Sequence, residues 1–72
     1  MNRKYNKMLV KEKFCREFMK PQDFSALLGM LNWHPNTLIT NLTRKSKKVR
    51  SQAAVVELLR RKGLTDQEIL ED

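Results

Sequence analysis

The sequence predicts a small all-α domain of four to five helices, and two observations support this prediction. Apolar side chains recur at helical spacing, and no stretch alternates strictly between apolar and polar residues as a half-buried strand would. The chain has 72 residues, of which 40 % are hydrophobic, and a chain this short can bury one core only. We therefore expect residues 1–72 to form a single domain.

The first helix is expected over residues 3–19. Its inner face is predicted from an apolar stripe of Tyr5, Met8, Leu9, Cys15, Phe18 and Met19, widened by Val10 and Phe14. We interpret the cations of this segment as the solvated face of an amphipathic helix. Pro21 either ends this helix or stands in the first turn of the next one.

A short second helix is expected around residues 22–31. Its apolar residues stand at i, i+3, i+4 and i+7, and they are Phe24, Leu27, Leu28 and Leu31. Gly29 lies near the end of this helix, where glycine adopts a left-handed cap at little cost. Residues 32–34 are then expected to form a turn.

The third helix is expected to begin at Pro35, because the first helical position needs no backbone N–H, and to run to about Arg44. Leu38, Ile39 and Leu42 form its predicted inner face. The stretch RKSKKVRS that follows is expected to be a basic loop.

Two further helices are expected after this loop. Ser51 can cap a fourth helix, and Gly63 suits the position just beyond its end. Thr65 and Glu68 match a capping box, which predicts a short fifth helix in the acidic segment 64–72. A core of this size is marginal, and the terminal segment has apolar residues to bury. We therefore expect a homodimer through Leu64, Ile69 and Leu70, or through the first helix.

The second and third helices, joined by a tight polar turn, have the plan of a helix-turn-helix at about residues 21–45. In that motif the second of the two helices, here about residues 35–44, enters the major groove of DNA. The outer face of this helix contains no acidic residue. Asn can pair with adenine, Arg with guanine, and the Thr methyl group can contact thymine. The predicted base contacts are therefore Asn36, Thr37, Thr40, Asn41 and Arg44.

The charge distribution favours the same partner. The formal net charge is +7, which predicts attraction to polyanions. Two basic blocks, at 1–20 and 44–62, enclose a middle part whose only charge is Asp23, and an acidic tail follows. Because the second block directly follows the predicted recognition helix, we expect phosphate contacts from Lys45, Lys47, Lys48 and Arg50.

A resemblance to a known family rests on these same residues. FSALLG followed by HPNTLITNL resembles the helix-turn-helix of phage lambda repressor and Cro proteins, in which Ser-Pro-x-Thr-Ile opens the recognition helix. The resemblance covers about residues 21–64. Between Gly29 and Pro35 the chain is longer than in those proteins, so either the turn is longer or the second helix runs on to Leu31. The resemblance implies a small transcriptional regulator of a phage or mobile element.

The sequence thus predicts a sequence-specific regulator that binds double-stranded DNA in the cytoplasm, at the nucleoid. It offers no catalytic set, and His34 and Cys15 are its only histidine and cysteine. We therefore expect no enzyme activity, metal, cofactor, small-molecule ligand or membrane. The alternative is a basic helical protein that binds and inhibits another protein. RNA binding is a third possibility, although the aromatic residues that stack on bases are scarce here.

Overall fold

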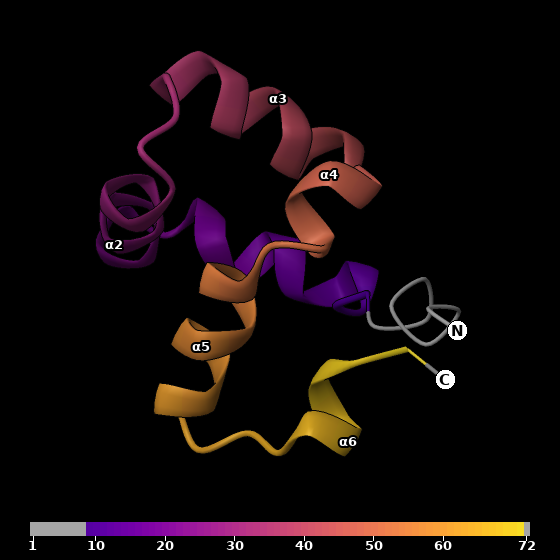
Figure 1. Ribbon diagram of the computed structural model, residues 1–72. Coiled ribbons are helices and arrows are strands. Elements are labelled where there is room, and N and C mark those ends of the chain that lie inside the picture. The colour runs from indigo at the N-terminus through magenta and orange to yellow at the C-terminus, as the bar shows by residue number, and fades with distance from the viewer. Residues whose placement is uncertain (1–8, 72) are drawn as a thin grey trace.

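The computed structural model describes residues 9–71 and confirms the predicted all-α class. Its elements are the 3₁₀-helix η1 (Glu12–Met19) and the α-helices α2 (Pro21–Leu31), α3 (Pro35–Arg44), α4 (Lys47–Arg50), α5 (Ala53–Arg61) and α6 (Asp66–Ile69). In Figure 1, α3 and α4 lie on one side of η1, and α5 and α6 lie on the other. Both α2 and α3 pack against η1, and α5 packs against α2 and α6.

One core joins these elements. Its buried apolar residues come from every helix and from the segment before η1, and they are Val10, Cys15, Phe18, Leu27, Leu38, Leu42, Val49, Val55, Leu58, Leu59 and Ile69. Trp33, in the turn between α2 and α3, packs against this core from its edge. Burial raises the pKa of the Cys15 thiol, in keeping with a thiol that serves as a small core residue.

The first helix differs from the prediction in its extent and its type. Tyr5 and Met8, which were assigned to it, lie outside the described residues. From Glu12 on the helix is 3₁₀, so side chains three residues apart lie above one another. Cys15 and Phe18 therefore both face the core, whereas Met19 is 48 % exposed and not on the inner face as predicted.

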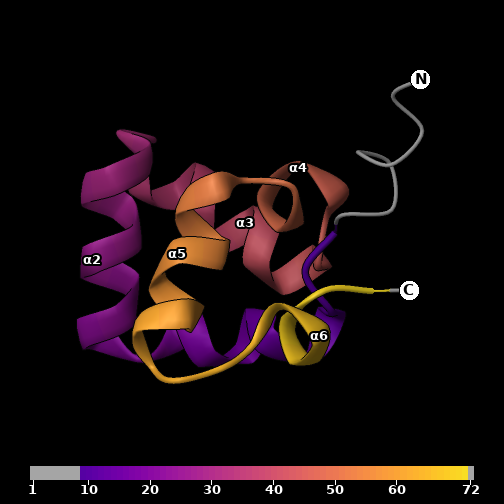
Figure 2. The ribbon, with the colours of Figure 1, turned by 60° about the horizontal axis from the view of Figure 1, so that its bottom comes forward.

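The helix does not begin earlier because the chain before it pairs with the C-terminal residues. Val10 and Leu70 form an antiparallel bridge. The Lys11 N–H donates to the Ile69 carbonyl over 2.8 Å, and the Glu71 N–H donates to the Leu9 carbonyl over 2.8 Å. The two ends of the described chain thus lie side by side, as both views of the ribbon show (Figures 1 and 2).

The helices α2 and α3 begin with a proline in the first turn, and α2 ends at Leu31 as predicted, but its capping residue is different. Pro21 and Pro35 occupy the first turns of the two helices, and the His34 Nδ1 accepts the Asn36 N–H over 3.2 Å as a cap. Gly29 does not cap α2, which runs on to Leu31 and ends at left-handed Asn32. Asn tolerates this conformation better than most residues, and Leu31 gains contact with the core by staying helical.

The basic stretch after α3 is not a loop. Ser46 accepts the Val49 N–H and caps the one-turn helix α4, which buries Val49. Ser51 does not cap α5, because its hydroxyl donates to the Lys48 carbonyl and Gln52 occupies the capping position. Gly63 follows α5 with a φ of +94°, the left-handed conformation predicted for it.

The capping box of the last helix is confirmed. Thr65 Oγ1 accepts the Glu68 N–H, and the Glu68 carboxylate accepts the Thr65 N–H over 2.8 Å. The hydrogen bond from the Thr65 backbone lowers the pKa of Glu68, with smaller contributions from nearby Lys13 and Lys11. At the same helix start, Arg60 binds Asp66 through two hydrogen bonds and lowers the pKa of that carboxyl. Together these contacts fasten α6 against the end of α5.

Candidate nucleic-acid interface

The outer face of α3 consists of short polar side chains. Leu38 and Leu42 hold the helix on the core, so the residues on the opposite side are turned to solvent. Four of the five predicted base contacts are exposed, and they are Asn36, Thr37, Thr40 and Arg44. Because no acidic residue lies on α3, this face presents hydrogen-bonding groups and one cation without a competing carboxylate. Such a face suits the edges of bases, which offer both donors and acceptors.

Two further residues belong to this face although sequence reasoning did not assign them to it. Thr43 is exposed, and its spacing of three residues from Thr40 could have identified it. Ile39 was predicted to lie on the inner face, but it is 41 % exposed. The core side of α3 is filled by Leu38 and Leu42, which leaves Ile39 at the margin of the outer face.

Asn41, the fifth predicted base contact, is half-buried and engaged within the protein. Its Nδ2 donates to the Thr37 carbonyl over 2.7 Å, and its Oδ1 accepts the Ser46 hydroxyl. The Asn41 carbonyl also accepts the Ser46 N–H. In this arrangement the Asn41 amide joins the end of α3 to the start of α4, unlike the four exposed residues predicted to contact bases.

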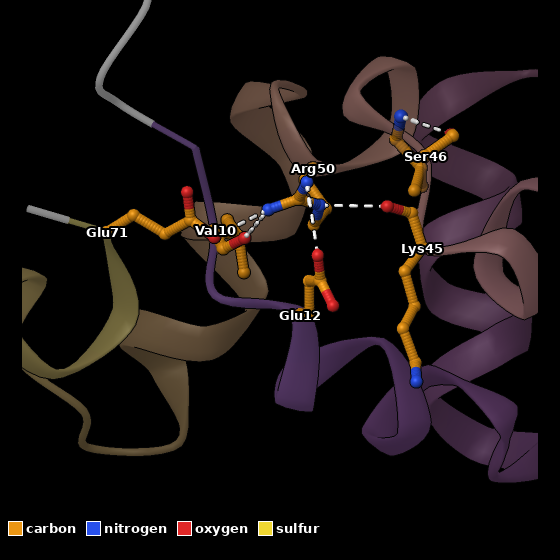
Figure 3. A network of polar contacts seen from close by, with 7 residues as sticks. Val10, Glu12, Lys45, Ser46, Arg50 and Glu71 are labelled. Atoms are coloured by element: carbon orange, nitrogen blue, oxygen red, sulfur yellow. Dashed lines mark hydrogen bonds and ion pairs between the residues drawn. The ribbon is translucent and has the colours of Figure 1, made fainter.

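The predicted phosphate contacts separate into two groups. Lys45, Lys47 and Lys48 are exposed around the end of α3 and on α4. Lys48 also lies over the ring of Trp33, with its Nζ 5.1 Å from the ring centroid. Lys45 ends α3 in the left-handed conformation, and in Figure 3 its ammonium group points away from Arg50. These three cations stay available to an external anion.

Arg50 was predicted to contact phosphate, and the structure contradicts this. Its side chain is only 7 % exposed, at the point where α4 meets both ends of the described chain (Figure 3). Nε donates to the Lys45 carbonyl over 3.0 Å, and Nη1 donates to the Val10 carbonyl over 3.2 Å. Nη1 also donates to the Glu71 carboxylate over 2.8 Å, while Nη2 lies 3.8 Å from a Glu12 carboxylate oxygen. The guanidinium is therefore occupied by the protein itself.

The other cations of residues 9–71 divide according to whether a carboxylate pairs with them. Four exposed pairs lie away from α3 and α4, and they are Lys20–Glu17, Arg60–Asp66, Arg61–Glu57 and Lys62–Asp23. Among the described residues, the cations with no ion pair are Lys11, Lys13, Arg16, Arg44, Lys45, Lys47 and Lys48. Uncompensated positive charge thus gathers on η1, the end of α3 and α4.

The predicted dimer residues do not form one exposed patch. Ile69 has no exposed surface and belongs to the core of the protomer, so its assignment to an interface is wrong. Leu64 and Leu70 are half-buried. An apolar groove that sequence reasoning missed lies beside Leu70, between α2 and α5, and it is lined by Met30, Ser51, Ala53, Ala54, Val56, Glu57, Arg60 and Leu70. Met30 is 45 % exposed there.

Comparisons of the chain with protein-family models, with curated proteins and with solved structures found no match. Within residues 9–71, no three His, Cys, Asp or Glu side chains lie close enough together to hold a metal ion. None of the helices that the structure describes is long and apolar enough to cross a membrane.

Proposed function

We propose that this protein binds double-stranded DNA in a sequence-specific manner and regulates transcription, in the way of the Cro and repressor class. The unit α2–turn–α3 acts as a helix-turn-helix, and α3 enters the major groove. The observation that supports this most is the outer face of α3. It is polar and free of acids, and Lys45, Lys47 and Lys48, which have no carboxylate partner among the described residues, follow it directly in the chain.

In this proposal the base edges face Asn36, Thr37, Thr40 and Arg44, with Thr43 and Ile39 added from the structure. Ile39 offers an apolar group to a thymine methyl at the margin of this face. Lys45, Lys47 and Lys48 contact the phosphate backbone beside the groove. Bound at a promoter, the protein regulates by occluding or recruiting the transcription machinery.

The base-reading and phosphate-binding residues are expected to respond differently to substitution. Arg44→Ala should cost about 1–3 kcal/mol on a preferred duplex and much less on random duplex, because guanine recognition depends on sequence. Lys47→Ala should weaken both duplexes alike and flatten the plot of log affinity against log salt by about 0.9, the effect of one lost phosphate contact. The preferred duplex comes from selection out of a random pool, and fluorescence anisotropy over a salt series measures both quantities.

Arg61→Ala is the matched control, because it removes an exposed cation that Glu57 already pairs. It should change neither the preference between duplexes nor the salt slope appreciably. A wild-type protein that ignores random duplex at low salt would contradict DNA binding. Equal losses on both duplexes from Arg44→Ala would show that α3 does not read bases.

Dimerisation is the second part of the proposal. A single module buries little DNA surface, and helix-turn-helix dimers read two half-sites about one helical turn apart. The groove beside Leu70 is the available apolar surface, and its occupant is a second copy of the chain. Ala53, Ala54 and Val56 of α5 line the groove, and a two-fold axis can place these apolar residues of one protomer against those of its partner.

Sedimentation velocity at tens of micromolar is expected to show a dimer. Val56→Glu should give a monomer, because it places a charge in the apolar groove. Ile39→Glu is the control, since it adds the same charge at an exposed apolar residue that lies outside the groove. A wild-type protein that sediments as a monomer, both free and bound to DNA, would exclude this part of the proposal.

A further inference from the structure

A second cluster of cations lies on η1, apart from the outer face of α3. Because η1 is a 3₁₀-helix, residues three positions apart lie above one another, and this places Lys13 and Arg16 on the same side. Both side chains are exposed, and neither is paired with a carboxylate among the described residues. In the sequence these two cations belong to the predicted solvated face of the first helix, and only the fold brings Lys45 close to them.

Lys45 completes this cluster from the other side. A hollow of about 380 Å³ lies between η1 and the end of α3, and it is lined by Glu12, Lys13, Arg16 and Lys45. The ammonium group of Lys45 is directed away from the Arg50 network, as Figure 3 shows. We call this site the η1–α3 hollow.

The charge balance of the η1–α3 hollow favours an anion. Three cations face one carboxylate, and that carboxylate of Glu12 lies 3.8 Å from the Arg50 guanidinium. Like charges held close together are unfavourable unless an anion compensates them. All four side chains that line the hollow carry a charged group, so it suits a hydrated phosphate better than an apolar ligand.

We infer that the η1–α3 hollow binds a phosphate group of the nucleic-acid backbone, through Lys13, Arg16 and Lys45. This inference rests on the proposed function and extends it. Lys45 belongs both to the end of α3 and to the hollow, so the site continues the phosphate-binding surface from α4 onto η1. A nucleic-acid backbone bound by the cations of α4 would therefore continue to the cations of η1.

The test compares two variants of the full chain that each lose one Lys and one Arg. Lys13→Gln with Arg16→Gln removes charge from the hollow. The control variant is Lys20→Gln with Arg61→Gln. It loses the same two positive charges, but at exposed side chains that already form ion pairs with carboxylates. Fluorescence anisotropy with a labelled random duplex over a salt series gives the slope of log affinity against log salt. Circular dichroism melts check that both variants stay folded.

The hollow variant is expected to flatten the salt slope by about 0.9 for each lost phosphate contact, up to about 1.8, and the control variant to leave it nearly unchanged. Equal slopes for the hollow variant and the wild type, with the duplex still bound, would overturn the inference and leave the proposed function intact. Equal flattening in both variants would also overturn it, because net charge alone would explain the effect. A wild-type protein that does not bind duplex at any salt concentration would overturn the proposed function and this inference together.

Discussion

Replacing Leu38 by alanine is expected to lower the free energy of unfolding by about 2–5 kcal/mol, as truncations of buried leucines do. Leu38 has no exposed surface and lies at the centre of the side of α3 that packs on η1. This loss of stability has two parts, the free energy of burying the methyl groups that are removed and the cost of the cavity that they leave. Chemical denaturation followed by circular dichroism measures this change.

Thr40→Ala and Thr43→Ala are the controls for α3, because both threonines lie on its exposed face. Surface substitutions of this kind usually change stability by less than about 0.5 kcal/mol. If either threonine variant proved as costly as Leu38→Ala, the outer face of α3 would be a packed surface. The proposed recognition face would then be withdrawn together with its base contacts.

Replacing Arg50 by methionine is expected to be the second large destabilisation. Methionine can replace the apolar stem of the side chain, but it leaves the carbonyl groups of Val10 and Lys45 without their donor. A buried acceptor that loses its partner costs about 1–3 kcal/mol, and two are affected here. Glu71 also loses its ion pair. Amide hydrogen exchange at Lys11 and Glu71 should accelerate in this variant, because both N–H groups join the segments that Arg50 holds together.

Arg44→Met provides the matched control, since it makes the same chemical change at an exposed cation with no carboxylate partner in the described residues. Its unfolding free energy should stay close to that of the wild type, whereas its affinity for a preferred duplex should fall. For Arg50→Met we expect a lower unfolding free energy and an unchanged affinity for the preferred duplex. Its salt slope should also stay unchanged under conditions in which the protein is folded. A flattened slope would mean that Arg50 contacts phosphate, as the sequence had suggested.

Local chemistry made several features of this fold predictable. Pro21 and Pro35 mark helix starts because a first-turn residue needs no N–H, and Gly63 marks a helix end because it accepts a positive φ. The capping box at Thr65 and Glu68 follows from two side chains three residues apart. The polar face of α3 could be predicted in the same way, because Leu38 and Leu42 define the opposite side.

Features that depend on contacts between distant segments could not be predicted. The sequence shows Arg50 in a run of basic residues, and only the fold brings Val10 and Glu71 to it. Asn41 has the right spacing for a base contact, but Ser46 takes up its side-chain oxygen once α4 forms.

The sequence by itself determined that the chain is all-α, where α2, α3 and α6 begin, and that one helix has an acid-free polar face. These are consequences of spacing within a few residues. The tertiary structure decided that η1 is a 3₁₀-helix, that Ile69 is core, and that Arg50 is internal while Lys13, Arg16 and Lys45 share a hollow. The physical reason is that burial and ion pairing depend on which distant segments meet, and the pairing of Leu9–Lys11 with the C-terminal residues sets that arrangement.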